Sequence, residues 1–175
     1  MALLEIRQYP DPVLRKRCRP VVEITPDIQR LIDDMVETMY AAPGVGLAAP
    51  QVGVSLRLVV VDIGREEEGD PDSLMVLINP EMVYQEGEFE EDEGCLSIKG
   101  FSANVTRAAF VRVRATDRHG RQFEVEGEGY LAKAFQHELD HIDGRLFIDR
   151  LSPLKRDLFK RRLKKDLKRE EAEVS

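Results

Sequence analysis

The chain has 175 residues, 26 of them Lys or Arg and 33 Asp or Glu, which gives a formal net charge of −7 at pH 7. A chain of this length buries about two-thirds of the surface that it exposes when unfolded, so it suits one domain with a genuine hydrophobic core. The apolar share of 42% and the charged share of 34% are typical of a globular protein and exclude a disordered one. The acidic excess argues against general nucleic-acid binding, so we expect no DNA partner.

Membrane and export signals are not expected in this sequence. No apolar stretch approaches the length of about 20 residues that a membrane span requires, and the longest, at 58–63, is strand-sized. The first residues lack the cationic segment and apolar run of a secretory signal, so we expect a cytoplasmic protein without a membrane partner. Two cysteines, Cys18 and Cys95, are too few for a disulfide framework, and we expect at least one to be reactive or a metal ligand.

Helix and strand signals occur in separate blocks along the chain. A first helix is expected from Thr25, a good N-cap followed by proline, to Pro43 and Gly44, which end it. The strands are expected at 56–63, 75–78, 83–89, 103–107, 110–117 and 121–127, with a loop at 65–73. A second helix is expected at 130–142, and a third begins after Pro153.

The order of helix, many strands, helix and helix indicates an α+β fold. We expect mixed or antiparallel strands to pack around the central helix at 130–142. A basic, amphipathic C-terminal helix is expected at 150–170, with 171–175 as a loose tail.

Charge is concentrated in two runs. Residues 81–93 hold seven acids and no base, and we expect this run to be a solvated surface. Residues 150–170 hold ten bases and three acids. On the sequence alone we favour a helix docked on the core with a solvated polar face, and the alternative is electrostatic contact with ribosomal RNA.

The segment His137-Glu138-Leu139-Asp140-His141 carries the chemistry. On a helix, positions four apart lie on one face, so His137 and His141 can bind one metal ion together. Glu138 is rotated by about 100° from His137, which places its carboxylate beside the ion, where a general base for water belongs. The pattern therefore favours a catalytic metal site over two unrelated surface histidines.

A catalytic metal site usually has three protein ligands and one open position. His119 lies in an expected Arg-His-Gly turn and is most simply a solvated loop residue. No histidine follows His141, and the last glutamates lie in the charged tail, so the third ligand is sought upstream. Cys95 is the candidate, because Gly94 lets the backbone bend close to an ion and a thiolate makes a softer site than three histidines. Cys18, without such a context, is expected to be a buried apolar residue.

A third motif, Gly-Val-Gly-Leu-Ala-Ala-Pro-Gln at 44–51, lies between the first helix and the first expected strand. Alone it is a weak signal, because such a connector is commonly just a turn, and no Gly-Lys-Ser/Thr follows to make a phosphate-binding loop. Its small side chains let main-chain groups approach a ligand, and Gln51 offers an amide donor. This combination suits a peptide-like substrate that runs alongside an exposed strand.

Together with Glu-Gly-Cys-Leu-Ser at 93–97 and Gln-His-Glu-Leu-Asp-His at 136–141, this segment closely resembles the three motifs of the peptide deformylase family. The resemblance covers nearly the whole chain and implies a single catalytic domain over residues 1–175. The sequence departs from many members at Ile98-Lys99-Gly100, where they have a small apolar residue and proline. Lys99 is therefore expected to change contacts at the substrate rim.

The resemblance implies that Cys95, His137 and His141 hold one divalent metal ion. The ion would be Fe²⁺ in the native enzyme, with Zn²⁺, Ni²⁺ or Co²⁺ able to replace it, and water would take the fourth position. Glu138 would move the proton.

The resemblance also implies the substrate and the residues that bind it. The reaction would be hydrolytic removal of the formyl group from N-formylmethionyl nascent peptides, with release of formate. Gln51 and the backbone N–H of Leu96 would stabilise the oxyanion formed at the formyl carbon, and Gly46 would be a main-chain partner for the substrate backbone. An apolar methionine pocket is expected, with Ile98, Phe135 and His137 on the flanking segments.

Two other readings compete. A zincin-type metalloprotease is disfavoured because no suitable third ligand lies downstream of the helix. A ribosome-binding homologue without activity is disfavoured because every expected ligand and the general base are present.

Overall fold

The computed structural model describes residues 2–64 and 73–174 of the chain. The loop that we expected at 65–73 lies outside the described residues, apart from its last position. The helices and strands are α1 (Pro26–Ala41), β1 (Gly46–Ala48), β2 (Leu58–Val61), β3 (Met75–Glu86), β4 (Phe89–Cys95), β5 (Ile98–Arg107), β6 (Phe110–Thr116), β7 (Gln122–Glu128), α2 (Tyr130–Ile142) and α3 (Pro153–Val174). Short 3-10 turns at η1 (Pro12–Arg15), η2 (Ala49–Val52) and η4 (Phe147–Arg150) connect them.

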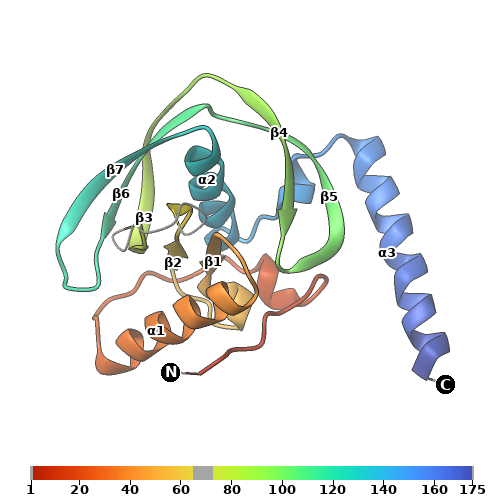
Figure 1. Cartoon of the computed structure of the whole chain (residues 1–175), viewed down its shortest axis with the longest axis horizontal. Coiled ribbons are helices and arrows are strands. Elements are labelled where there is room, and N and C mark those ends of the chain that lie inside the picture. Colours follow the sequence, from red (N-terminus) through yellow and green to blue (C-terminus); the bar gives the residue numbers. More distant parts are fainter. Residues whose placement is uncertain (1, 65–72, 175) are drawn as a thin grey trace.

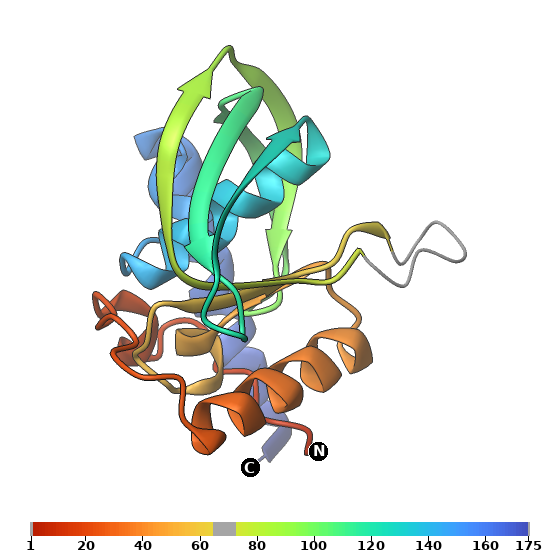
Figure 2. The ribbon, with the colours of Figure 1, turned by 90° about the vertical axis from the view of Figure 1, so that its left-hand side faces the viewer.

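The strands form two antiparallel sheets, and the α+β fold is confirmed. The larger sheet has the order β1-β2-β3-β6-β7, and the smaller one is the β4–β5 hairpin. Helix α2 lies in the middle of the molecule, enclosed by the strands, as expected for the helix that carries the histidines (Figure 1). Helix α1 lies on the opposite side of the larger sheet (Figure 2).

Strand β2 shows how the sheet separates the two helices. Its four residues are fully buried, and successive side chains point to opposite faces. Val59 and Val61 belong to the hydrophobic cluster that includes Phe135 of α2, and Leu58 and Val60 belong to the cluster beneath α1. A strand covered on both faces reads as a continuous apolar run, which is the pattern in the sequence.

The two helices that we expected before the C-terminal helix are confirmed. The side chain of Thr25 accepts a hydrogen bond from the backbone N–H of Ile28, Pro26 is the first residue of α1, and the helix ends at Ala41, just before Pro43. Helix α2 has the bounds that its periodicity predicts.

The strand boundaries differ from the expected ones in several places. Strand β1 lies in the segment that we expected to be a connector, and β5 begins at Ile98 rather than at residue 103. The expected strands at 75–78 and 83–89 are joined in one strand, β3, which ends at Glu86 and whose pairing with β6 shifts register between Ile78 and Glu81. Asn79, with a φ of 52°, lies at that shift, and its side-chain amide forms two hydrogen bonds with the backbone of Val21. The segment 89–95 is also a strand, and it pairs with β5 although most of its residues are acidic.

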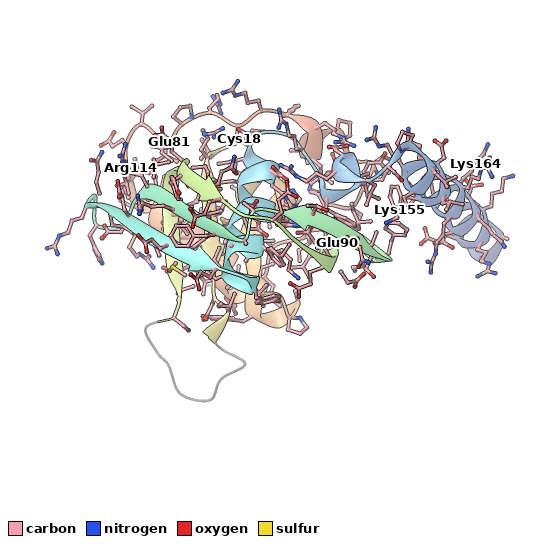
Figure 3. All side chains as sticks on the ribbon, turned by 90° about the horizontal axis from the view of Figure 1, so that it is seen from above. Cys18, Glu81, Glu90, Arg114, Lys155 and Lys164 are labelled. Carbon is pink, nitrogen blue, oxygen red and sulfur yellow. The ribbon has the colours of Figure 1, made fainter. Side chains whose placement is uncertain are left out.

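Helix α3 begins at Pro153 and continues through Val174, so most of the expected loose tail is helical. Phe159 and Leu163 dock the helix against the hydrophobic cluster that contains Phe101 of β5. The part of α3 beyond Leu163 extends away from the body of the molecule and carries basic residues such as Lys164 (Figure 3). No helix in the described part of the chain is both long enough and apolar enough to cross a membrane.

Candidate active site

Helix α2 presents both histidines to one point. His137 and His141 are buried, and their Nε2 atoms lie 3.1 Å apart. The helix ends before Gly144, whose φ of 76° suits glycine and where a Cβ would lie 2.5 Å from the backbone oxygen of Arg15. The chain can therefore turn away tightly after His141.

Cys95, the last residue of β4, completes the group. Its Sγ atom lies 3.4 Å from Nε2 of His141, and the ligand atoms of Cys95, His137 and His141 all lie within 4.8 Å of one another. One thiolate and two imidazoles match the donor set of a catalytic metal site with an open position. Cys18 is also a free cysteine, but it is buried in the hydrophobic core, as expected.

The electrostatics around the histidines favour a cation. Burial alone would lower the pKa of His137, but Cys95, Glu93 and Glu138 surround the ring and raise that pKa well above its ordinary value. Burial lowers the pKa of His141 well below its ordinary value, and positive charge on His137 and Arg107 lowers it further. The thiol and the two carboxylates around His137 therefore favour positive charge at this point, which a divalent metal ion would supply.

Glu138 lies beside the histidines in a buried position. Its Oε1 atom is 4.0 Å from Nε2 of His137, and its Oε2 atom has no hydrogen-bond partner among the described residues. Burial raises the pKa of Glu138 to about 7, although the charge of His137 opposes that shift. An unpartnered carboxylate oxygen beside the three ligands is what a general base for water requires.

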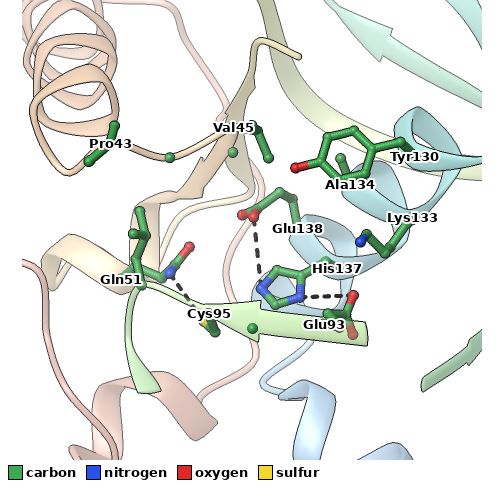
Figure 4. A pocket seen from close by; sticks show the side chains of 14 residues that line it. Pro43, Val45, Gln51, Glu93, Cys95, Tyr130, Lys133, Ala134, His137 and Glu138 are labelled. Atoms are coloured by element: carbon green, nitrogen blue, oxygen red, sulfur yellow. Dashed lines mark hydrogen bonds and ion pairs between the residues drawn. The ribbon is translucent and has the colours of Figure 1, made fainter. Parts of the chain in front are cut away.

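Gln51 approaches the same point from the short helix η2. Its side-chain carbonyl accepts a hydrogen bond of 2.9 Å from the backbone N–H of Ala48, which fixes the orientation of the amide. Its Nε2 atom lies 3.7 Å from Sγ of Cys95 and 3.2 Å from Oγ of Ser97 (Figure 4). The amide donor is therefore held next to the metal ligands.

A cavity of about 390 Å³ opens at these residues (Figure 4). It is lined by Pro43, Gly44, Val45, Gly46, Gln51, Glu93, Gly94, Cys95, Leu96, Tyr130, Lys133, Ala134, His137 and Glu138. Of the residues that we placed beside a methionine pocket, His137 lines it, whereas Ile98 and Phe135 are buried in two separate hydrophobic clusters.

Glu93 corrects the interpretation of the acidic run. Its neighbours Glu90, Glu91 and Asp92 are exposed as expected, but Glu93 is only 4% exposed. Burial would raise its pKa, yet His137 and Arg107 outweigh that effect and hold the pKa below its usual value. Alternation along a strand turns one acid of a charged run inward, and its only sequence signal is its position two residues before Cys95.

The structure separates the other candidates from the site. His119 is exposed in the turn between β6 and β7, as expected. Lys99 is exposed and lines a different cavity, between β5 and α3. Tyr130 and Lys133, which sequence reasoning did not select, line the cavity from α2, two turns and one turn before His137.

Known proteins resemble this chain over nearly its whole length. The family model described as polypeptide deformylase matches residues 3–157. A peptide deformylase of Thermodesulfovibrio yellowstonii is 54% identical over 164 residues, which cover 94% of this chain and 98% of that protein. One of Syntrophobacter fumaroxidans is 53% identical over 168 residues, covering 96% and 98%.

Solved structures give the same result. The crystal structure of a peptide deformylase from Legionella pneumophila superposes with a TM-score of 0.88 at 50% identity and covers 97% of this chain and 98% of that one. A peptide deformylase from Synechococcus elongatus, solved in complex with actinonin, has a TM-score of 0.85 at 39% identity, covering 93% and 87%.

Proposed function

The chain belongs to the polypeptide deformylase family and is a metal-dependent hydrolase that removes the formyl group from nascent peptides, and we propose that it does so in the cavity between β1, β4 and α2. The observation that carries this proposal is the convergence of one cysteine and two histidines at the base of that cavity. The whole chain, residues 1–175, would act as a single catalytic domain.

Cys95, His137 and His141 would hold the metal ion. We propose ferrous iron as the native ion, with zinc, nickel or cobalt able to replace it, because imidazole and thiolate donors suit such ions. When bound, the ion would supply Lewis acidity and lower the pKa of water. The cavity reaches two of the three ligands, Cys95 and His137, and would admit the substrate to that side of the ion.

Glu138 would take the proton of the attacking water and give it to the amine that leaves. Its unpartnered Oε2 atom and its place beside His137 support this role. Gln51 would donate from its amide to the oxyanion at the formyl carbon, and the backbone N–H of Leu96 would donate to the same oxygen. Gly46, in the edge strand β1, would pair with the backbone of the peptide.

Formate release from formyl-Met-Ala-Ser by anaerobically purified enzyme tests the proposal. We expect turnover of about 1 s⁻¹ or more, the low end of usual enzyme rates. Glu138→Gln should keep one equivalent of metal and lose about 10²- to 10⁴-fold in kcat, since it keeps the shape and removes the proton acceptor. The exposed Glu124→Gln is the matched control.

Other outcomes would contradict the proposal. Absence of formate with a full equivalent of metal would favour a binding protein without activity. Internal cleavage of unformylated peptides would favour a protease. Loss of metal in Glu138→Gln would make Glu138 structural.

We also propose a cytoplasmic enzyme that contacts the ribosome through α3. The exposed bases on the outer part of this helix support an electrostatic contact with RNA. Reversing Lys164 and Lys165 to Glu should reduce co-sedimentation with ribosomes at low salt several-fold and leave hydrolysis of free peptides unchanged. The control reverses Arg112 and Arg114, whose side chains are 39% and 50% exposed, and equal binding by both double variants would refute the contact.

A further inference from the structure

Four charged residues next to His137 form a continuous network of ion pairs. Arg107, the last residue of β5, donates from Nη2 to both carboxylate oxygens of Glu93, at 3.1 and 2.8 Å. From Nη1 it donates to Oδ2 of Asp140 at 2.7 Å. Arg150, the last residue of η4, donates from Nε and Nη2 to the two oxygens of Asp140, both at 2.7 Å. The four residues come from β4, β5, α2 and the turn that leads into α3.

Most of this ion-pair network is buried, so the position of each side chain depends on its neighbours in the network. Exposed side-chain fractions are 1% for Arg107, 3% for Glu93 and 10% for Asp140, whereas Arg150 reaches the surface at 40%. The two guanidinium groups and the two carboxylates cancel in charge. Because a buried charge is stable only while it is paired, removing one member disturbs the next.

The ion-pair network ends at His137, a proposed metal ligand. Oε1 of Glu93 lies 3.3 Å from Nδ1 of His137, so that nitrogen carries the proton and Nε2 presents its lone pair to the open side. A carboxylate on the far nitrogen fixes both the tautomer and the ring orientation of a metal-binding histidine. Nδ1 of His141 has no hydrogen-bond partner among the described residues, so no carboxylate fixes that ring in the way that Glu93 fixes His137.

We propose that Asp140 and Arg150 are positioning residues for His137. They act through Arg107 and Glu93 and connect the base of α3 to the metal site. Arg107 can hold the Glu93 carboxylate in place only while its own guanidinium is held, and Asp140, fixed by the two bonds from Arg150, is the group that holds it. The inference deepens the proposed function and rests on the proposed metal site.

Metal affinity of Arg150→Gln tests the inference. Arg150 is partly exposed, so this substitution should leave the protein folded. Partners that bond a metal ligand directly are worth 10- to 100-fold in affinity, so we expect this remote one to weaken Co²⁺ or Zn²⁺ binding by about 3- to 10-fold in a chelator competition. Arg150→Lys should restore part of the loss, because it keeps the charge and loses the paired geometry.

Arg114→Gln is the matched control, since it removes a guanidinium from an exposed ion pair with Glu124 on the other sheet. A purely structural role for Arg150 would lower the melting temperature of the metal-free protein without changing the metal dissociation constant. A dissociation constant in Arg150→Gln equal to that of the control would therefore overturn the inference.

A double variant gives a second, independent readout. Glu93→Gln should weaken metal binding by about 10- to 100-fold. If Arg150 acts through Glu93, adding Arg150→Gln to Glu93→Gln should weaken metal binding little further, because the ion-pair network is already interrupted. If the double variant instead loses metal affinity by the product of the two separate fold-changes, the inference is overturned.

Failure of this inference is distinguishable from failure of the metal site. If Cys95→Ser binds metal as tightly as the unchanged enzyme does, then the proposed site itself is wrong. If Cys95→Ser weakens binding and Arg150→Gln does not, only the positioning role falls.

Discussion

At Gly46 the missing side chain is part of the site. A Cβ atom there would lie 2.8 Å from Oε1 of Glu138 and 3.0 Å from its Cγ and Cδ atoms. Glu138 is buried and held between β1 and the histidine face of α2, so it has little room to move. Glycine at this position therefore leaves the space that the proposed general base occupies, in addition to the expected main-chain contact with substrate.

Gly46→Ala should lower kcat and leave the fold intact. The added methyl group displaces the carboxylate of Glu138, and a misplacement of about 1 Å in a catalytic group can cost roughly a hundredfold in rate. The checks are formate release at saturating substrate, metal content and circular dichroism. The exposed Glu124→Gln in β7, outside the cavity, is the control. Equal rates in the two variants would show that the space at Gly46 is unimportant.

Among the elements, α3 is the one that the core holds least. Phe159 is 2% exposed, and its ring centroid lies 4.7 Å from that of Phe101 and 5.4 Å from that of Tyr9. Beyond Leu163, which is partly buried, the described residues of the helix are exposed. The attachment of α3 therefore depends on the buried Phe159 and the partly buried Leu163 in its first half.

Phe159→Ala should release α3 from the body or destabilise the protein by about 3–5 kcal/mol, the usual cost of removing a buried aromatic ring. Denaturant unfolding and limited proteolysis after 150–160 measure the two outcomes. Deletion from Lys164 onward is the contrast, and it should change the free energy of unfolding by no more than about 0.5 kcal/mol. A larger loss of unfolding free energy in the deletion than in Phe159→Ala would mean that the outer half attaches the helix.

At the scale of the whole molecule, the proposed metal ion joins the hairpin to the central helix. Cys95 comes from β4 and the histidines from α2, so an ion held by all three side chains would link the two elements. An ion that binds only the folded chain stabilises it by mass action.

Removal of the metal should therefore abolish formate release and lower the melting temperature. At free metal about 1,000 times the dissociation constant, binding contributes about 4 kcal/mol, which for a chain of this size corresponds to roughly 8–16 °C. Calorimetry of the chelated and reloaded protein measures the shift, and reloaded Cys95→Ser should show much less of it. An unchanged melting temperature on chelation would mean that the ion does not join the two elements.

Local sequence patterns were enough to predict two helices and the three proposed metal ligands. The spacing of apolar residues and the caps predicted α1 and α2, and a separation of four residues placed His137 and His141 on one face, because contacts within a helical turn depend on the backbone alone. The motif at 93–97 and the need for a third ligand pointed to Cys95. These predictions needed no knowledge of how the strands pair.

The tertiary structure decided what lies around those residues. Glu93 belongs to an acidic run in the sequence, and only the β4–β5 pairing turns it toward His137 and Arg107. Arg150 reaches Asp140 because η4 folds back against α2, and Tyr130 lines the cavity because β4 lies opposite its face of the helix. Such contacts join residues that are distant in the chain, so register and packing determine them, and composition and periodicity carry no record of either.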